Sequence, residues 1–235
     1  MPETRTAESA SLKPAIPAIL LAGGKSSRMG GGDKCLRQLA GRPILDRVIE
    51  RIRPQVAGLV INANGPATRF DSYHLPVVPD DIAGQPGPLA GILAGLDWAA
   101  LQARPAHGLQ AGGRAVDYVL IVSTDCPFLP LDLVARLLPA MVAGAEIAIA
   151  ESNGRRHPVI GLWRVGLRVD LRKALALEHL RKVEAFCDRH RTVAINFEGA
   201  VNFPGGTVDP FFNANTPEDL AVAERLWTQP RPQQV

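Results

Sequence analysis

Short apolar runs bounded by glycine or proline alternate along this chain with stretches whose apolar residues recur at helical spacing. Such runs predict buried strands, and the helical spacing predicts amphipathic helices. The predicted strands are Ala15–Leu21, Leu59–Ala63, Pro76–Pro79, Tyr118–Ser123, Glu146–Ala150, Val159–Trp163 and Thr192–Phe197. The predicted helices are Pro43–Arg53, one that begins at Pro88 and ends near Ala100, one containing Leu133–Leu138, much of 166–190, and a last one after Asn215, with Thr216 as its cap and Pro217 in its first turn.

The alternation of strands and helices predicts an α/β fold of three layers, in which a mostly parallel, Rossmann-like sheet is covered on both faces. We expect one domain over residues 15–227, a flexible extension over 1–14 and a disordered tail over 228–235. Residues 104–114 are rich in glycine and alanine and are expected to form a flexible surface insertion. In such a sheet, ligands bind beyond the carboxyl ends of the strands, so the chemistry is expected there.

Composition narrows the class of ligand. The net charge is +3 at neutral pH with a pI of about 9.0, which suits an anionic ligand but is too small to indicate nucleic acid, and no lysine/arginine block is present. No apolar run approaches the length of a membrane span. The three cysteines lie far apart and form no C-x-x-C, which disfavours a disulfide framework or zinc site and favours a reducing, cytoplasmic setting.

The loop after the first predicted strand has the composition of a phosphate-binding loop. It reads LAGGKSSRMGGGDK from Leu21 to Lys34 and contains five glycines, with Arg28 and Lys34 supplying positive charge. Glycines let backbone N–H groups approach anionic oxygens, so a triphosphate fits. The loop is not a P-loop, because the first glycine of that motif would fall on Ile19. The alternative to phosphate binding is a flexible, solvated loop that only connects the first strand to the next helix.

This loop resembles the L-A-G-G-x-S-x-R-M-G-G-x-D-K motif of molybdenum cofactor guanylyltransferases, within the nucleotidyltransferase superfamily. The resemblance continues in collinear order over residues 16–226. The further motifs are INAN at 61–64, GPLAG at 87–91, TDCP at 124–127, HP at 157–158 and NANTPEDL at 213–220. It implies the Rossmann-like nucleotidyltransferase fold and the transfer of GMP from GTP to the phosphate of molybdopterin, with Mg²⁺ as cofactor and pyrophosphate as leaving group.

The resemblance also implies residue roles on the nucleotide side. Asp125 would bind Mg²⁺, Asp80 would contact the nucleotide, Lys34 would lie nearest the α-phosphate, and Arg28 with the loop N–H groups would hold the β- and γ-phosphates. The nucleotide site would further include Leu21, Ala22, Gly23, Gly24 and Asn62. The Asn62 amide can donate and accept, which suits recognition of base or ribose. Strand-end turns are the alternative for Asp125, Asp80 and Asn62, and helix capping is a further one for Asp125.

Three residues are candidates for binding molybdopterin, the acceptor of the GMP group. His157, Asn213 and Asn215 are candidates to line the molybdopterin pocket. The alternatives are a histidine whose hydrogen bonds are satisfied within the sheet and two asparagines that cap the last helix. Molybdenum insertion proteins, molybdoenzymes or their chaperones are candidate protein partners, and neither nucleic acid nor a membrane is expected.

Three other functions compete with guanylyl transfer. A molybdopterin cytidylyltransferase would carry L-A-A-G where this chain has Leu21–Gly24, and the second glycine leaves room for the larger guanine base. A sugar-1-phosphate nucleotidyltransferase would share the glycine loop but is expected to have a longer chain. A non-catalytic module that binds and delivers nucleotide or cofactor is disfavoured by the presence of Lys34 and Asp125.

Overall fold

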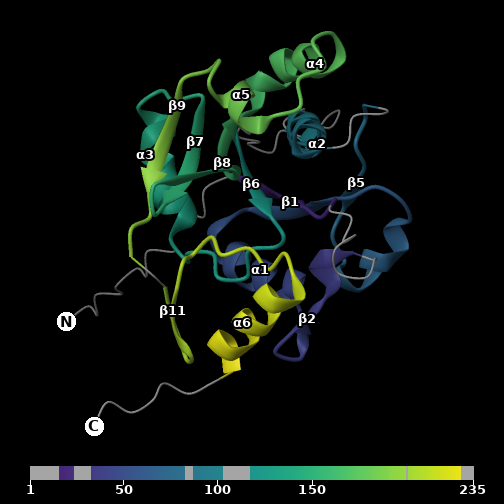
Figure 1. Cartoon of the computed structure of the whole chain (residues 1–235). Helices are drawn as coiled ribbons and strands as arrows, with labels where there is room; N and C mark the ends of the chain where they lie inside the picture. The colour runs from purple at the N-terminus through teal and green to yellow at the C-terminus, as the bar shows by residue number, and fades with distance from the viewer. Residues whose placement is uncertain (1–15, 24–32, 83–86, 103–116, 200, 229–235) are drawn as a thin grey trace, which may run out of the picture.

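The computed structural model describes residues 16–23, 33–82, 87–102, 117–199 and 201–228. Within them, a sheet of seven strands in the order β5-β4-β1-β6-β8-β7-β9 forms the middle of the molecule (Figure 1). Its strands are β1 Pro17–Leu21, β4 Gly58–Asn62, β5 Val77–Val78, β6 Tyr118–Ser123, β7 Ile147–Ser152, β8 Arg155–Arg164 and β9 Thr192–Asn196. Two short hairpins accompany it, β2 Gln38–Leu39 with β3 Arg42–Pro43, and β10 Val201–Phe203 with β11 Gly206–Val208.

Strands β5, β4, β1 and β6 are parallel neighbours, so their carboxyl ends lie at one edge. Leu21 at the end of β1 is in register with Asn62 of β4 and with Ser123 of β6, and Asn62 is in register with Val78. In the sheet, β4 and β5 lie on one side of β1, and β6, which follows them in the chain, lies on the other side. Beside β1 the sheet therefore has a topological switch point, which is where ligands bind in open α/β sheets.

Each central strand is buried on both faces and divides its side chains between two cores. In β1, Ala18 and Leu20 belong to one core and Ile19 to the other. Helices α1 Ile44–Ile52, α3 Leu133–Val142 and α6 Pro217–Thr228 contribute to the first core, and α2 Pro88–Gln102, α4 Arg168–Ala176 and α5 Val183–Cys187 to the second. Figure 1 shows α1 and α6 across the sheet from α2 and α4. The predicted three-layer fold is confirmed.

Turn chemistry explains where the last helix begins. Thr216 Oγ1 accepts a hydrogen bond from the Asp219 N–H at 3.1 Å, and the Asp219 carboxylate accepts from the Thr216 N–H at 2.9 Å. This reciprocal pair satisfies amide donors that the first turn of a helix leaves without partners. The predicted cap at Thr216 is confirmed, with Pro217 at the first helical position. The helix ends at Thr228, which the predicted tail had included.

The structure differs from the predicted elements mainly in the second half of the chain. Strand β8 begins at Arg155, four residues before the predicted Val159, because the polar residues and Pro158 there hid the strand, and it runs antiparallel to β6 and β7. The neighbouring strand extends to Ser152 rather than Ala150, beyond an irregularity in the pairing at Ile149/Ala150. The helical segment 166–190 is divided between α4 and α5.

Three predictions lie on other parts of the chain. Residues 1–14, 104–114 and 229–235 are outside the described residues. Within the described part, none of the helices has the length and apolar character needed to cross a membrane.

Candidate functional site

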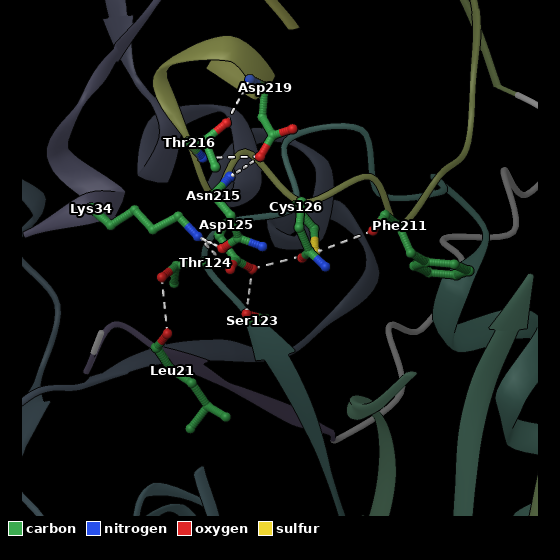
Figure 2. Close-up of polar contacts among 11 residues, drawn as sticks. Leu21, Lys34, Ser123, Thr124, Asp125, Cys126, Phe211, Asn215, Thr216 and Asp219 are labelled. Carbon is green, nitrogen blue, oxygen red and sulfur yellow. Dashed lines mark hydrogen bonds and ion pairs between the residues drawn. The ribbon is translucent and has the colours of Figure 1, made fainter. Parts of the chain in front are cut away.

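Several polar residues singled out in the sequence lie at the carboxyl edge of the parallel strands, among them Lys34, Asn62, Asp80 and Asp125. Lys34 belongs to a short 3-10 helix, η2 Lys34–Leu36, that follows the glycine loop, and Asp125 lies in the turn after β6. The Lys34 Nζ lies 2.8 Å from Oδ2 of Asp125, and the two side chains are only 14% and 23% exposed. Figure 2 shows this pair beside the end of β6. An ammonium group and a carboxylate at a switch point are suited to bind a phosphate and a cation, respectively.

Lys34 also joins this edge to the segment before α6. Its ammonium group donates a second hydrogen bond to Oδ1 of Asn215, and the Ala214 N–H donates to the backbone carbonyl of Asp125 at 2.9 Å. Two segments distant in sequence, one at Lys34 and one at Ala214–Asn215, therefore converge on the turn that carries Asp125. The structure thus places Asn215, a candidate for the molybdopterin pocket, beside Lys34 and Asp125, which are candidates for the nucleotide side.

The second oxygen of Asp125 is held from its own strand. Ser123 Oγ donates to Oδ1 at 2.5 Å, and Cys126 Sγ lies 3.5 Å from the same oxygen. The Cys126 thiol is fully buried and donates to Oδ1 of Asn213 at 2.9 Å. Burial, with the Asp125 charge as the next contribution, raises the pKa of this thiol well above its ordinary value of 9.0. The thiol therefore stays protonated and remains a donor.

Asp80, which follows β5, is held by two asparagines at the end of β4. Asn62 Nδ2 donates to Oδ1 of Asp80 at 3.0 Å, and Asn64 Nδ2 donates to Oδ2 at 2.8 Å. The Asp80 N–H in turn donates to Oδ1 of Asn64 at 2.9 Å. Because one amide is bound to each carboxylate oxygen, the plane of the Asp80 carboxylate is fixed while its outer lone pairs stay available to a ligand.

Asn62 is itself nearly fully buried, and both of its amide hydrogens are engaged. Besides Asp80, Nδ2 donates to the carbonyl of Val78 at 3.1 Å. A Cβ atom added at Gly91 in α2 would lie 2.2 Å from Oδ1 of Asn62, so the glycine of the GPLAG motif makes room for this carboxamide. In this arrangement only the oxygen of Asn62 remains to accept a bond, and the expected role as a donor to base or ribose does not follow from the geometry.

His157 lies in a different polar cluster, between β7 and β8. Its Nε2 is 2.8 Å from Oγ of Ser152, and that hydroxyl also bonds the Asp209 carboxylate at 2.9 Å. Since the hydroxyl has one hydrogen and gives it to the carboxylate, His157 donates from Nε2. Burial lowers the pKa of His157 from its ordinary value of 6.5, although Asp209 acts in the opposite direction. The ring packs on Phe211 with centroids 4.7 Å apart.

The other predicted site residues divide between described and undescribed parts of the chain. Leu21 ends β1, and its carbonyl accepts from Thr124 Oγ1 at 2.9 Å; Ala22 and Gly23 follow at the same edge. Gly24 and Arg28 lie outside the described residues.

Sequence reasoning did not single out Ser123, Asn64 or Cys126. A hydroxyl that ends an apolar strand two residues before Asp125 is a weak signal for Ser123. Asn64 and Cys126 stood inside quoted motifs, but nothing in the sequence indicated which partners they would find.

The donor set at this edge suits a hard cation. The described residues contain no group of three or more His, Cys, Asp and Glu side chains arranged to hold a metal. Mg²⁺ is, however, commonly bound through one or two carboxylates together with water and substrate phosphates. Asp125, with amide oxygens of Asn213 and Asn215 nearby, offers that kind of oxygen environment.

Comparison with known proteins agrees with this picture. The family model of the MobA-like NTP transferase domain matches residues 18–193. A molybdenum cofactor guanylyltransferase of Bradyrhizobium sp. strain ORS 278 is 54% identical over 90% of this chain and 93% of its own length. One from Rhodopseudomonas palustris strain BisB5 is 51% identical over 91% of this chain and 94% of its own. In fold, the chain resembles molybdopterin-guanine dinucleotide biosynthesis protein A of Archaeoglobus fulgidus, with a TM-score of 0.67 at 22% identity, covering 89% of this chain and 97% of that one.

Proposed function

The chain belongs to the molybdenum cofactor guanylyltransferases of the MobA-like NTP transferase family, and from this premise we propose how its residues transfer GMP from GTP to molybdopterin. The terminal phosphate of molybdopterin attacks the α-phosphate of GTP, a new P–O bond forms, and pyrophosphate leaves. No covalent intermediate with the protein is required. Catalysis then rests on positioning the two substrates and on stabilising the charge that develops on the phosphate oxygens.

Lys34 is assigned to the α-phosphate. Its ammonium group ends between Asp125 and Asn215, at the edge where the glycine loop would bring the triphosphate. Arg28 and the N–H groups of residues 23–32 are assigned to the β- and γ-phosphates on the basis of sequence alone. A largely buried ammonium group at this point can stabilise the negative charge that develops on the α-phosphate and on the leaving pyrophosphate.

Asp125 is assigned to Mg²⁺. When bound, the ion supplies charge neutralisation on the triphosphate oxygens. The carboxylate forms the ion pair with Lys34, and its neighbours Asn213 and Asn215 contribute oxygens of the kind that Mg²⁺ prefers.

Asp80 is assigned to the nucleoside. Its carboxylate is oriented by Asn62 and Asn64, and it presents acceptors at the same edge as Leu21–Gly23. Such acceptors match N–H groups of guanine or ribose hydroxyls. Asn62 can add its oxygen, while Gly24 is assigned the role of leaving space for the purine.

Asn213 and Asn215 are assigned to the molybdopterin phosphate and pterin, because they adjoin the turn that carries Asp125. His157 would act indirectly: its ring packs on Phe211, two residues before Asn213, and would help to position that asparagine. The product would pass to molybdenum insertion proteins, molybdoenzymes or their chaperones.

The observation that carries this proposal is the Lys34–Asp125 pair at the switch point of the sheet. It is tested by measuring pyrophosphate release from GTP, CTP and ATP in the presence of molybdopterin and Mg²⁺. We expect release with GTP to exceed that with CTP by at least tenfold, and Asp125→Asn to abolish it while metal-free GTP binding persists. Tight GTP binding without pyrophosphate release would instead indicate a non-catalytic delivery module.

A further inference from the structure

The hydroxyl of Ser123 is the closest donor to the Asp125 carboxylate. Ser123 is the last residue of β6 and is held in register with Leu21 of β1. Its Oγ lies 2.5 Å from Oδ1 of Asp125, which is the length of a hydrogen bond from a hydroxyl to an ionised carboxylate. Bonds of this kind are roughly twice as strong as those between neutral groups.

Two donors on opposite oxygens fix the orientation of that carboxylate. Lys34 Nζ bonds Oδ2 and Ser123 Oγ bonds Oδ1. A carboxylate held at only one oxygen could rotate about its terminal torsion, which has a broad energy profile. Of these two donors, Lys34 has the proposed role of binding the phosphates, which would compete with its bond to Asp125. Ser123 has no such competing task.

The contacts of Asp125 also argue against a purely structural role for the pair. Among the described residues, its carboxylate accepts hydrogen bonds from the side chains of Lys34 and Ser123, and the Cys126 sulfur lies 3.5 Å from Oδ1. The residue preceding α3 at its start is Asp132. Asp125 is therefore not the cap of that helix. Within the described part of the chain, its carboxylate is held by side chains and not by the backbone N–H groups of a turn.

We propose that Ser123 is a positioning residue that aims one Asp125 oxygen at the catalytic cation. The proposal rests on the function assigned above. Groups that hydrogen-bond to a metal-ligating carboxylate hold it in the orientation that the metal requires, and their loss costs roughly tenfold to 100-fold in metal affinity. Ser123→Ala should therefore weaken the cation and leave the nucleotide contacts unchanged.

The test separates metal affinity from nucleotide affinity. Calorimetry would give the affinity of the full-length protein for guanosine 5′-(α,β-methylene)triphosphate, which cannot react, with and without Mn²⁺. The ratio of the two affinities measures how strongly the cation is coupled to the site. For Ser123→Ala we expect the metal-free affinity to stay within about twofold of the wild type and the coupling ratio to fall at least tenfold.

Three further variants keep the test decisive. Ser123→Thr retains a hydroxyl and should restore the coupling ratio, and Ser123→Cys, with a weaker donor, should fall between serine and alanine. This order is measurable even if the alanine variant does not fold. Ser72→Ala removes an exposed serine from the 3-10 helix η4 Ala67–Tyr73 and serves as the matched control.

Two outcomes would overturn the inference. One is a coupling ratio in Ser123→Ala, or in Ser123→Cys, equal to that of the wild type. The other is an equal loss in the threonine and alanine variants, which would indicate that only local packing matters. A wild-type protein whose nucleotide affinity does not respond to Mn²⁺ and which releases no pyrophosphate would refute the proposed function instead.

Discussion

Gly91→Ala tests the proposed role of Asp80 and Asn62 in binding the nucleoside. Gly91 is the fourth residue of α2, and a Cβ atom there would lie 2.2 Å from Oδ1 of Asn62, 3.0 Å from its Cγ and 3.0 Å from Cδ2 of Leu21. Separations this short cannot persist, so either the Asn62 carboxamide rotates away or the helix shifts. Both responses disturb the bond from Asn62 to Asp80.

The magnitude follows from the contacts that are lost. Moving the carboxamide breaks its bonds to Val78 and Asp80, each worth about 0.5–1.5 kcal/mol. Replacing glycine by alanine inside a helix stabilises the helix by up to about 1 kcal/mol, which offsets part of this loss. The net destabilisation is then about 1–2 kcal/mol, which for a domain of this size lowers Tm by roughly 2–8 °C. With one of its two amide donors gone, Asp80 is less well aimed, and GTP should bind about tenfold more weakly, corresponding to about 1.4 kcal/mol.

Gly95→Ala supplies the control one turn further along the same helix. Its Cβ atom would lie 2.5 Å and 2.8 Å from two carbons of Ile19, a buried core residue, so it should destabilise the fold to a similar degree. Thermal unfolding measures the first effect, and calorimetry with GTP in the absence of acceptor measures the second. If Gly91→Ala stayed folded and bound GTP as tightly as Gly95→Ala, the Asn62–Asp80 arrangement would not determine nucleotide binding.

The remaining predictions address the reacting centre, the acceptor and the pH dependence of stability. Lys34→Ala should lower turnover more than tenfold in a pyrophosphate-release assay, because a charge aimed at the reacting phosphate contributes a few kcal/mol; near-normal turnover would remove it from catalysis. Cys126→Ala should raise the KM for molybdopterin about three- to tenfold by releasing Asn213, with the KM for GTP unchanged and Cys126→Ser restoring the bond; a rise in both KM values would indicate general loosening instead. Because burial lowers the pKa of His157 below 6.5, the unfolded chain takes up a proton that the folded chain does not, so the free energy of unfolding should fall as pH drops below about 6.5. His157→Gln should flatten that dependence in urea titrations, and an unchanged slope would contradict the assignment.

The edge of the sheet could be predicted from sequence because its strands are continuous apolar runs. Once β1, β4 and β6 are recognised and taken as parallel, the residues that end them must meet, and Leu21, Asn62 and Ser123 do so, with Asp125 two residues beyond Ser123. Strand β8 could not be bounded in the same way. Its first residues are polar and flank Pro158, and they are strand only because β7 pairs with them.

The partners within the site were beyond sequence reasoning for a different physical reason. Cys126 and Asn213 are 87 positions apart, and Lys34 and Asn215 are 181 apart. Hydrogen bonds of this kind depend on how separate elements pack, and no local propensity encodes them. Sequence could indicate that Asn62 was polar at a strand end, but not that Val78 and Asp80 would use both of its amide hydrogens.

The segment from Asp209 to Asn215, which carries the two asparagines proposed to bind the acceptor, is bonded to three separate parts of the fold. At the start of the segment, Ser152 of β7 donates to the Asp209 carboxylate. Near its end, the turn after β6 is bonded to the segment through the Asp125 carbonyl and the Cys126 thiol. Lys34 donates to Asn215, the last residue of the segment. Transfer of a nucleotidyl group needs the attacking phosphate aligned with the bond that breaks, and an error of about 1 Å can cost 100-fold in rate. A segment tied to the turn that carries Asp125 cannot move independently of it. If Asn213 and Asn215 bind the acceptor as proposed, they are held in one rigid arrangement with Lys34 and Asp125 before either substrate arrives.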